Sequence, residues 1–276
     1  MREFEFTIQG RRWRADLASP ADLAIPLRFD GPQPSFFATE PARAAPLRSG
    51  GFTGDVRLGG SCNCGVYSLA PHCHGTHTEC VAHVTAGGEH VAALTPVPPS
   101  LAVLLTVQPI QLEEIKLADV GGRALSDHVI TREMLFAATA RWLADPWTAL
   151  VIRTLPNDSS KLRRVYAGPC PAPYFTADAM DWIVERGVTS LVVDLPSLDR
   201  ADDGGALAAH RIYWGLPAAM RDPQLAVRGR ALVTELAYVP DTVPDGLHLL
   251  ELHVPAFGAD AAPSRPVLYP VQEIAA

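Results

Sequence analysis

The sequence lacks long apolar runs, because the longest of them, such as residues 101–105, are only five residues long. A membrane-spanning helix needs about 20 apolar residues, so we expect none in this chain. The chain also lacks a basic start followed by an apolar stretch, since it begins Met1-Arg2-Glu3-Phe4-Glu5. This start predicts no signal peptide and a cytoplasmic location.

An excess of positive charge is absent as well. Lys and Arg total 23 against 30 for Asp and Glu, the formal net charge is −7, and the basic residues are scattered. Nucleic acids and anionic membrane surfaces are bound through concentrated positive charge. We therefore expect neither as a partner.

Cysteine is scarce, at five residues, and that number is odd. Without an export signal a disulfide framework is not expected, and metal-binding or packing roles are favoured instead. The 276 residues are 48 % apolar and 19 % charged, which is enough for a sizeable core. We find no internal repeat, and the Pro-rich stretch at about residues 18–50 indicates an irregular arm.

The second half of the chain alternates strand and helix signals. Thr131 caps an expected helix to about Leu143, and Thr176 caps a second one that stops at Gly187. Buried strands are expected at 150–152 and 190–194, and further strands at 231–234 and 247–254. This order predicts an α/β fold with a mixed sheet.

Histidine and cysteine gather in one segment of the chain. Five of nine histidines and four of five cysteines lie between residues 62 and 90. Within it, Cys73, His77, Glu79 and His83 are spaced at i, i+4, i+6 and i+10. On a regular strand these positions share one face, because side chains alternate with period two. Zinc accepts sulfur, imidazole and carboxylate ligands, so the pattern predicts a metal site at Cys73, His77 and Glu79.

A site with three protein ligands leaves room for a water molecule whose pKa the metal lowers. His83, further along the same face, is then the candidate general acid/base. The flanking His72 and His74 are alternative first ligands if the local register shifts. Cys62, Cys64, Cys73 and Cys80 also leave redox chemistry open as a weaker alternative.

The segment resembles the signature of the cyclase family of metal-dependent hydrolases, which includes bacterial kynurenine formamidase and isatin hydrolase. That signature runs His-x-Gly-Thr-His-x-Asp-x-Pro-x-His. Here Gly75-Thr76-His77 and His83 match it, while Cys73 replaces the first His, Glu79 the Asp and Val81 the Pro. Further stretches also resemble the family, namely Asp16-Leu17, residues 151–154, residues 176–197 and Pro263-Ser264-Arg265.

The resemblance implies one cyclase-like domain over residues 1–276, with a mixed, barrel-like sheet flanked by helices. By order and context, His210 and Glu235 would complete a second metal position. The implied activity is hydrolysis of an amide-type bond, in an N-formyl compound, a cyclic amide or a lactone. The implied partners are a small-molecule substrate, one or two metal ions per chain, and further copies of the chain in a homodimer or homotetramer.

The departures from the signature bear on metal choice and on function. A thiolate at position 73 favours zinc over manganese, the alternative metal. Glu79 moves its carboxylate by one methylene relative to an Asp, which alters metal spacing. A relative that has kept the fold but lost catalysis, and binds a small ligand or a structural metal, is therefore the alternative function.

Overall fold

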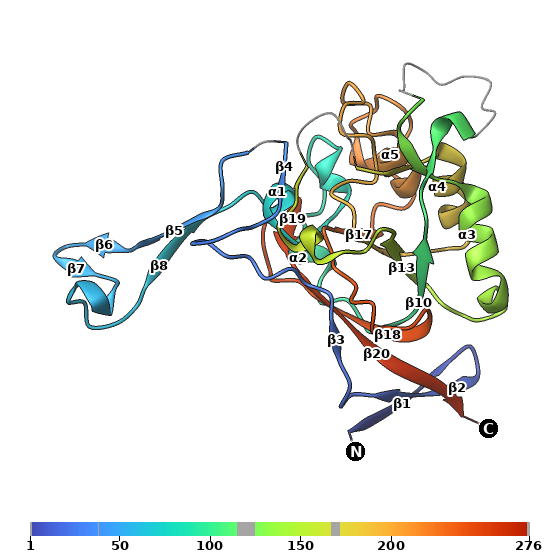
Figure 1. Ribbon diagram of the computed structural model, residues 1–276, viewed down its shortest axis with the longest axis horizontal. Helices are drawn as coiled ribbons and strands as arrows, with labels where there is room; N and C mark the ends of the chain where they lie inside the picture. The colour runs from blue at the N-terminus through green and yellow to red at the C-terminus, as the bar shows by residue number, and fades with distance from the viewer. Residues whose placement is uncertain (1, 38, 115–124, 167–171, 275–276) are drawn as a thin grey trace.

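The computed structural model describes residues 2–37, 39–114, 125–166 and 172–274. Its centre is an eleven-stranded mixed sheet (Figure 1). Neighbouring strands in it are, in order, β1 (Glu3–Ile8), β2 (Arg11–Asp16), β20 (Arg265–Ile274), β18 (Gly246–His253), β10 (Ser100–Val107), β13 (Ala149–Thr154), β16 (Ser190–Val193), β17 (Leu232–Glu235), β9 (His77–Glu79) and β19 (Ala261–Pro263). The short β3 (Ala21–Asp22) pairs with β20 beside this path.

Four central strands, β10, β13, β16 and β17, run parallel to one another. Three helices lie side by side along one face of them: α3 (Arg132–Thr139), α4 (Ala177–Glu185) and α5 (Ala208–Trp214) (Figure 1). The predicted alternation of strand and helix, and with it the α/β fold with a mixed sheet, is confirmed.

Local sequence signals explain where the helices begin and end. The Thr131 hydroxyl accepts a hydrogen bond from the backbone N–H of Met134, which satisfies a free donor at the start of α3. Thr176 precedes α4, but its hydroxyl donates to the Ile130 carbonyl and does not cap the helix. Gly187 follows α4 with a φ of 73°, a conformation that glycine adopts without strain.

The parallel strands are buried on both faces. Along β13, Leu150 and Ile152 pack in the cluster that contains the helices, while Ala149 and Val151 pack in a second cluster on the other face. The second cluster is closed by Leu23 and Val239, from segments outside the helices. Parallel strands covered on both sides have such continuous apolar sequences, which is why the short runs in this chain are strands.

Smaller elements surround the main sheet. They are β4 (Ser35–Phe36) paired with β14 (Val165–Tyr166); β11 (Ile110–Gln111), β12 (His128–Ile130) and β15 (Tyr174–Phe175) in a three-stranded sheet; and the short helices α1 (Pro71–His74) and α2 (Val91–Leu94). Single helical turns lie at Val56–Leu58, Val81–His83, Leu112–Glu114, Ala140–Trp142, Ser159–Arg163 and Pro223–Leu225.

An antiparallel ribbon projects from the body of the protein at the left of Figure 1. It contains β5 (Arg43–Pro46) with β8 (Gly65–Ser68), and β6 (Arg48–Ser49) with β7 (Phe52–Thr53). The expected arm at residues 18–50 therefore divides, because its first part joins the body through β3 and β4, and its last part forms the ribbon. Across the four described ranges, no helix is long and apolar enough to cross a membrane.

The expectation of one regular strand from Cys73 to His83 is wrong. Residues 71–74 form α1, residues 81–83 form a helical turn, and only His77–Glu79 is strand. Pro71 is the physical reason, because proline at the first position of a helix fixes φ near the helical value. The chain is then extended at Gly75 before β9 begins.

Candidate metal centre

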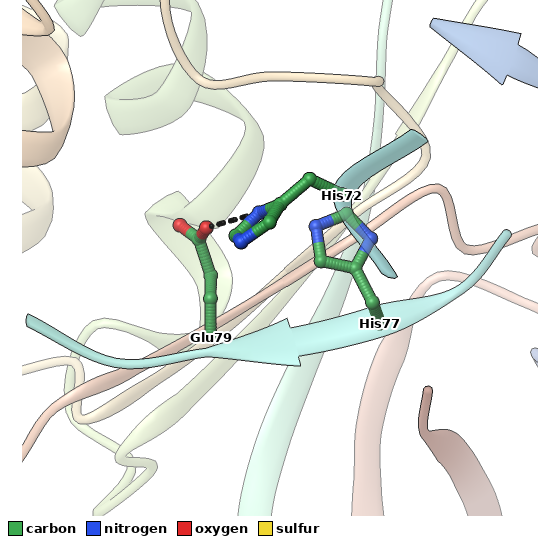
Figure 2. A group of neighbouring side chains, drawn as sticks. All are labelled: His72, His77 and Glu79. Atoms are coloured by element: carbon green, nitrogen blue, oxygen red, sulfur yellow. Dashed lines mark ion pairs between the residues drawn. The ribbon is translucent and has the colours of Figure 1, made fainter. Parts of the chain in front are cut away.

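Two neighbouring strands supply the floor of the candidate site. β9 runs antiparallel to β17, with His77 directly opposite Glu235. His77 and Glu79 are two residues apart, so their side chains leave β9 on the same face. Figure 2 shows both side chains rising from this strand toward His72. His77 and Glu79 are fully buried, and Glu235 is almost so.

The short helix α1 places His72 above β9. Its Nδ1 lies 3.1 Å from Glu79 Oε2, the contact drawn as a dashed line in Figure 2. Its Nε2 donates a hydrogen bond of 2.8 Å to Asp260 Oδ2. Asp260 directly precedes β19, the strand that pairs with β9 on the side away from β17.

The helix α5 contributes His210 from the other side. Asp199 accepts hydrogen bonds from the backbone N–H groups of Ala209 and His210, and from His210 Nδ1 at 2.6 Å. These contacts fix the ring so that its Nε2 lies 2.9 Å from Glu79 Oε1 and 3.3 Å from Glu235 Oε1. The strands and α5 thus bring two imidazoles and two carboxylates to one point.

Several atoms at this point are buried without a hydrogen-bond partner. They are His77 Nε2, His210 Nε2 and both carboxylate oxygens of Glu79. The distances between these nitrogen and oxygen atoms are short, but the groups are not oriented for hydrogen bonding. Leaving buried polar atoms unpaired is costly, and a bound cation would satisfy all four at once.

The outward nitrogens of the two buried rings are already occupied. His77 Nδ1 donates to the Gly75 carbonyl at 3.0 Å, and His210 Nδ1 donates to Asp199. Each Nε2 is therefore directed toward Glu79 and Glu235, and in the neutral ring it would offer its lone pair to a cation there. This is the arrangement of metal-ligating histidines, whose second nitrogen is held by a backbone carbonyl or carboxylate. The donor set of nitrogen and oxygen fits a divalent metal.

The charges in the cluster shift one another's pKa values. Burial alone would raise the pKa of Glu79, but His83, His210 and His72 hold it well below its usual range. For Glu235, burial and the nearby Glu79 charge both raise the pKa, yet the close imidazoles of His210 and His77 lower it on balance. Both carboxylates are therefore ionised at neutral pH and available as ligands.

The histidines respond in the opposite direction. Burial lowers the pKa of His72, but its hydrogen bond to Asp260 and the nearby Glu79 carboxylate raise it to about 10. Burial likewise opposes the charged form of His210, whose pKa is nevertheless raised well above its usual value by Glu79, Asp199 and Glu235. Without a metal, protons take the place that a cation would hold between these rings and carboxylates.

His83 lies at the border between the cluster and an adjoining cavity. It comes from the helical turn after β9, and its Nδ1 is 3.5 Å from Asp260 Oδ2 and 3.8 Å from Glu79 Oε2. Its ring stacks on His72 with centroids 4.3 Å apart. The cavity has a volume of about 250 Å³ and is lined by Phe36, Phe37, His72, His83, Arg200 and Glu235, among others.

A larger hollow of about 560 Å³ lies elsewhere, around Pro223 and Gly229. Its described lining contains no histidine, and Glu89 is its only acidic residue. The smaller cavity is therefore the one that meets the chemistry of the cluster.

The structure brings together five of the six residues proposed from the sequence: His77, Glu79, His83, His210 and Glu235. The sixth, Cys73, is buried, but its sulfur belongs to none of the groups of close ligand atoms found among the described residues. His72 takes the corresponding place. Metal binding by any of these residues stays a prediction.

Some neighbours of the site were not singled out from the sequence. Asp199 and Asp260 lie in loops, without a motif around them; Asp260 contacts His72, which is 188 residues away, and Asp199 contacts His210 in the helix that follows its loop. His74, the other flanking histidine, is held elsewhere: its Nδ1 accepts from the Ala70 N–H, and its Nε2 donates to the Glu40 carbonyl. Cys80 is fully buried beside β9, and burial raises the pKa of its thiol to about 11.

A family model described as "Putative cyclase" matches residues 21–200, which is more than half of the sequence. The chain belongs to the cyclase family. The matched region contains Cys73 through His83, whereas His210, Glu235 and Asp260 lie beyond it. No curated protein matches the chain.

Solved structures share the fold at low sequence identity. Isatin hydrolase A from Ralstonia solanacearum is 17 % identical, with 91 % of each chain covered and a TM-score of 0.58. A structure described as a novel cyclase is 16 % identical, covers 91 % of this chain and 87 % of its own, and has a TM-score of 0.60. A predicted metal-dependent hydrolase from Bacillus stearothermophilus is 16 % identical, with 91 % and 98 % covered and a TM-score of 0.55.

Proposed function

We propose that this cyclase is a metal-dependent hydrolase of a small molecule, acting on the amide-type bond of an N-formyl compound or a cyclic amide, or on the related ester bond of a lactone. The observation that carries the proposal is the convergence of unsatisfied buried atoms of His77, Glu79 and His210 beside a cavity lined by His83. Buried ligand atoms without partners are costly unless a metal satisfies them. A metal next to a cavity keeps a coordination position open for water, which is typical of a catalytic centre.

The metal would be held by His77, Glu79, His210 and Glu235, with one or two ions per chain. When bound, it supplies a Lewis acid that polarises a carbonyl and lowers the pKa of water. The preference for zinc came from a thiolate at position 73, which the centre does not include. Imidazole and carboxylate ligands suit zinc and also manganese, so zinc stays our prediction on the histidines alone.

His83 is proposed to transfer the proton to the leaving nitrogen or oxygen. Its imidazole lines the cavity, and its Nδ1 faces the carboxylates of Asp260 and Glu79. Because Nδ1 faces these carboxylates, Nε2 is the nitrogen that would exchange a proton with the substrate. A histidine in such a position contributes about 10²- to 10⁴-fold to the rate of a proton-transfer step.

The cavity favours a compact, flat substrate. Its volume of about 250 Å³ is just below the usual range for ligand pockets, about 300–1,000 Å³. Phe36 and Phe37 form its apolar wall with ring centroids 4.0 Å apart, and Arg200 adds a guanidinium at the same cavity. An aromatic ring bearing the scissile group matches this lining.

We also propose a cytoplasmic protein that assembles as a homodimer or homotetramer. The ribbon formed by β5 and β8 supports assembly, because it exposes Val66 and Tyr67 to more than half of their surface. Apolar side chains on a projecting ribbon are expected to be covered in a larger particle. Light scattering of the purified chain measures its oligomeric state.

The activity is tested by screening the metal-loaded protein against N-formyl anilines, cyclic amides and lactones. We expect hydrolysis of at least one class, and a fall in kcat of about 10²-fold or more in His83→Asn. His90→Asn is the matched control, since His90 is exposed and precedes α2, where Asn is a favourable cap. Absence of hydrolysis by a folded, metal-loaded protein would favour the non-catalytic alternative.

A further inference from the structure

His72 lies between two carboxylates from different parts of the chain. Its Nδ1 faces Glu79 Oε2 at 3.1 Å, within the buried cluster, and its Nε2 donates to Asp260 Oδ2 at 2.8 Å. The His72 ring also meets that of His77 edge-on, with an interplanar angle of 72° and centroids 5.0 Å apart. One nitrogen of His72 is thus directed into the centre and the other away from it.

The neighbouring Cys73 has a different environment. In a helix, successive side chains are rotated by about 100°, so His72 and Cys73 cannot both face β9 from the single turn of α1. The structure directs His72 toward Glu79 and leaves the Cys73 sulfur outside the groups of close ligand atoms in the described part of the chain. His74 is held by Ala70 and Glu40 and does not compete.

We propose that His72 ligates the metal through Nδ1 in place of Cys73, and that Asp260 is the residue that positions it. This inference rests on the proposed metal centre and changes its first ligand. It also places that ligand one residue before the position of the first histidine in the family signature.

The chemistry of imidazole supports this assignment. A neutral imidazole that gives its Nδ1 lone pair to a metal carries its proton on Nε2. Asp260 accepts that proton's hydrogen bond, which fixes the tautomer and the orientation of the ring. Carboxylates that hold a ligating histidine in this way raise its basicity, and their loss weakens metal binding by about 10- to 100-fold.

Asp260 is itself anchored to the strand that carries the other ligands. Its backbone carbonyl accepts from the N–H of Cys80 at 3.0 Å, directly after Glu79, and its neighbour Ala261 pairs with Glu79 in the sheet. Asp260 Oδ2 also lies 3.5 Å from His83 Nδ1. The same carboxylate therefore orients the ligand His72 and the proposed proton-transfer residue His83.

Cobalt substitution distinguishes the two candidate ligands without any assay of activity. A thiolate bound to Co²⁺ produces an intense near-ultraviolet charge-transfer band, whereas imidazole and carboxylate ligands do not. We expect no such band in the cobalt-loaded wild-type protein, and an unchanged visible spectrum in Cys73→Ser. A charge-transfer band that disappears in Cys73→Ser would overturn the assignment.

Metal affinity, measured by competition with a chelator, tests the roles of His72 and Asp260. We expect His72→Gln to bind metal at least 10-fold more weakly, and Asp260→Asn to bind it about 10- to 100-fold more weakly. Asp30→Asn is the matched control, because Asp30 is an exposed aspartate. Wild-type affinity in a folded His72→Gln variant would refute the ligand role.

Metal binding by the wild type and two variants separates the assignment of His72 from the existence of the metal centre. If the wild type binds metal and His77→Ala does not, the metal centre is supported. An unchanged metal affinity in His72→Gln then overturns only the assignment of His72 as a ligand. If the wild type binds no metal at all, the proposed function and the inference fall together. Circular dichroism of each variant verifies that it is folded.

Discussion

His77 and Glu235 lie directly opposite each other on the antiparallel strands β9 and β17, with His77 Nε2 3.5 Å from Glu235 Oε2. The sheet register, and not a flexible loop, sets this distance. Residues held on strands keep their geometry better than residues on loops, which suits a site that must bind a metal tightly. Glu235 is further fixed by the N–H of Leu198, which donates to its Oε1 at 2.9 Å.

Replacing Glu235 by Gln should remove a ligand while leaving the chain folded. Glu79 repels the Glu235 charge in the apo protein, but the neighbouring His210 and His77 outweigh that repulsion, so the loss of the charge lowers the stability of the metal-free protein as well. A metal at 100 times its Kd stabilises the wild type by about 2.7 kcal/mol, and we expect this gain to be lost in Glu235→Gln at the same metal concentration. Thermal unfolding without metal measures the stability of the metal-free fold, and thermal unfolding with metal measures the gain from metal binding. An equal metal-induced shift in the two proteins would contradict the ligand role.

Replacing Asp199 by Asn should weaken metal binding through His210. Asp199 holds His210 Nδ1 at 2.6 Å, and it also accepts from the first N–H groups of α5. We expect metal affinity to fall by about 10- to 100-fold, with a modest loss of stability from the weakened helix start. Isothermal titration calorimetry measures the affinity, and Asp202→Asn, at an exposed site in the same loop, is the control. Affinity unchanged from wild type would show that Asp199 acts on the helix alone.

The metal-free protein should lose stability as pH rises above neutrality. The pKa of His72 is raised in the folded state to about 10, from about 6.5 when unfolded. Its stabilising effect is therefore fully present below about pH 6.5 and lost as the pH rises toward 10. We expect the Tm of chelator-treated protein to fall across this window by about 2–4 °C per kcal/mol lost. The fall of Tm with rising pH should be smaller in His72→Gln and unchanged in His90→Gln.

Metal binding should have the opposite pH dependence. A cation must displace the protons on His72 and His210, so affinity is expected to rise with pH between about 6 and 8. Metal-induced stabilisation at fixed total metal measures this trend. A pH-independent affinity would mean that these histidines do not exchange protons for metal.

Phe37 is predicted to lower the stability of the fold and to strengthen substrate binding. It lines the cavity while 62 % exposed, and its φ of 57° is a left-handed conformation that phenylalanine rarely adopts. Phe37→Asn relieves this strain, so we expect stability to be equal or higher by about 1 kcal/mol. Loss of the ring should raise KM for an aromatic substrate by about 2- to 10-fold. Phe257→Asn, at an exposed site outside the cavity, serves as the control.

The sequence predicted the parts of the site that local pattern determines. His77 and Glu79 share a face because they alternate on a strand, and Glu235 ends a strand that the apolar run at 231–234 had indicated. The helix after Thr131 was recognisable from its cap, and the helix before Gly187 from its glycine stop, although Thr176 does not cap it. These features depend on residues close together in the chain.

The contacts that the sequence did not predict join distant segments. Asp260 meets His72 across 188 residues, and neither the loop before β19 nor the single turn of α1 carries a periodic signal. The exchange of Cys73 for His72 depends on one helical turn started by Pro71, where a strand had been expected. A change from strand to helix rotates each side chain to a new direction, so the ligand set could not be fixed without the backbone path.

Elemental analysis of protein purified without chelator, alongside His77→Ala, shows whether the chain holds a metal at this cluster. We predict one or two equivalents of a divalent metal per wild-type chain, zinc first and manganese as the alternative, and almost none in a folded His77→Ala variant. His90→Ala should retain the wild-type content. A wild-type protein that carries no metal, even after reloading with zinc or manganese, would contradict the account.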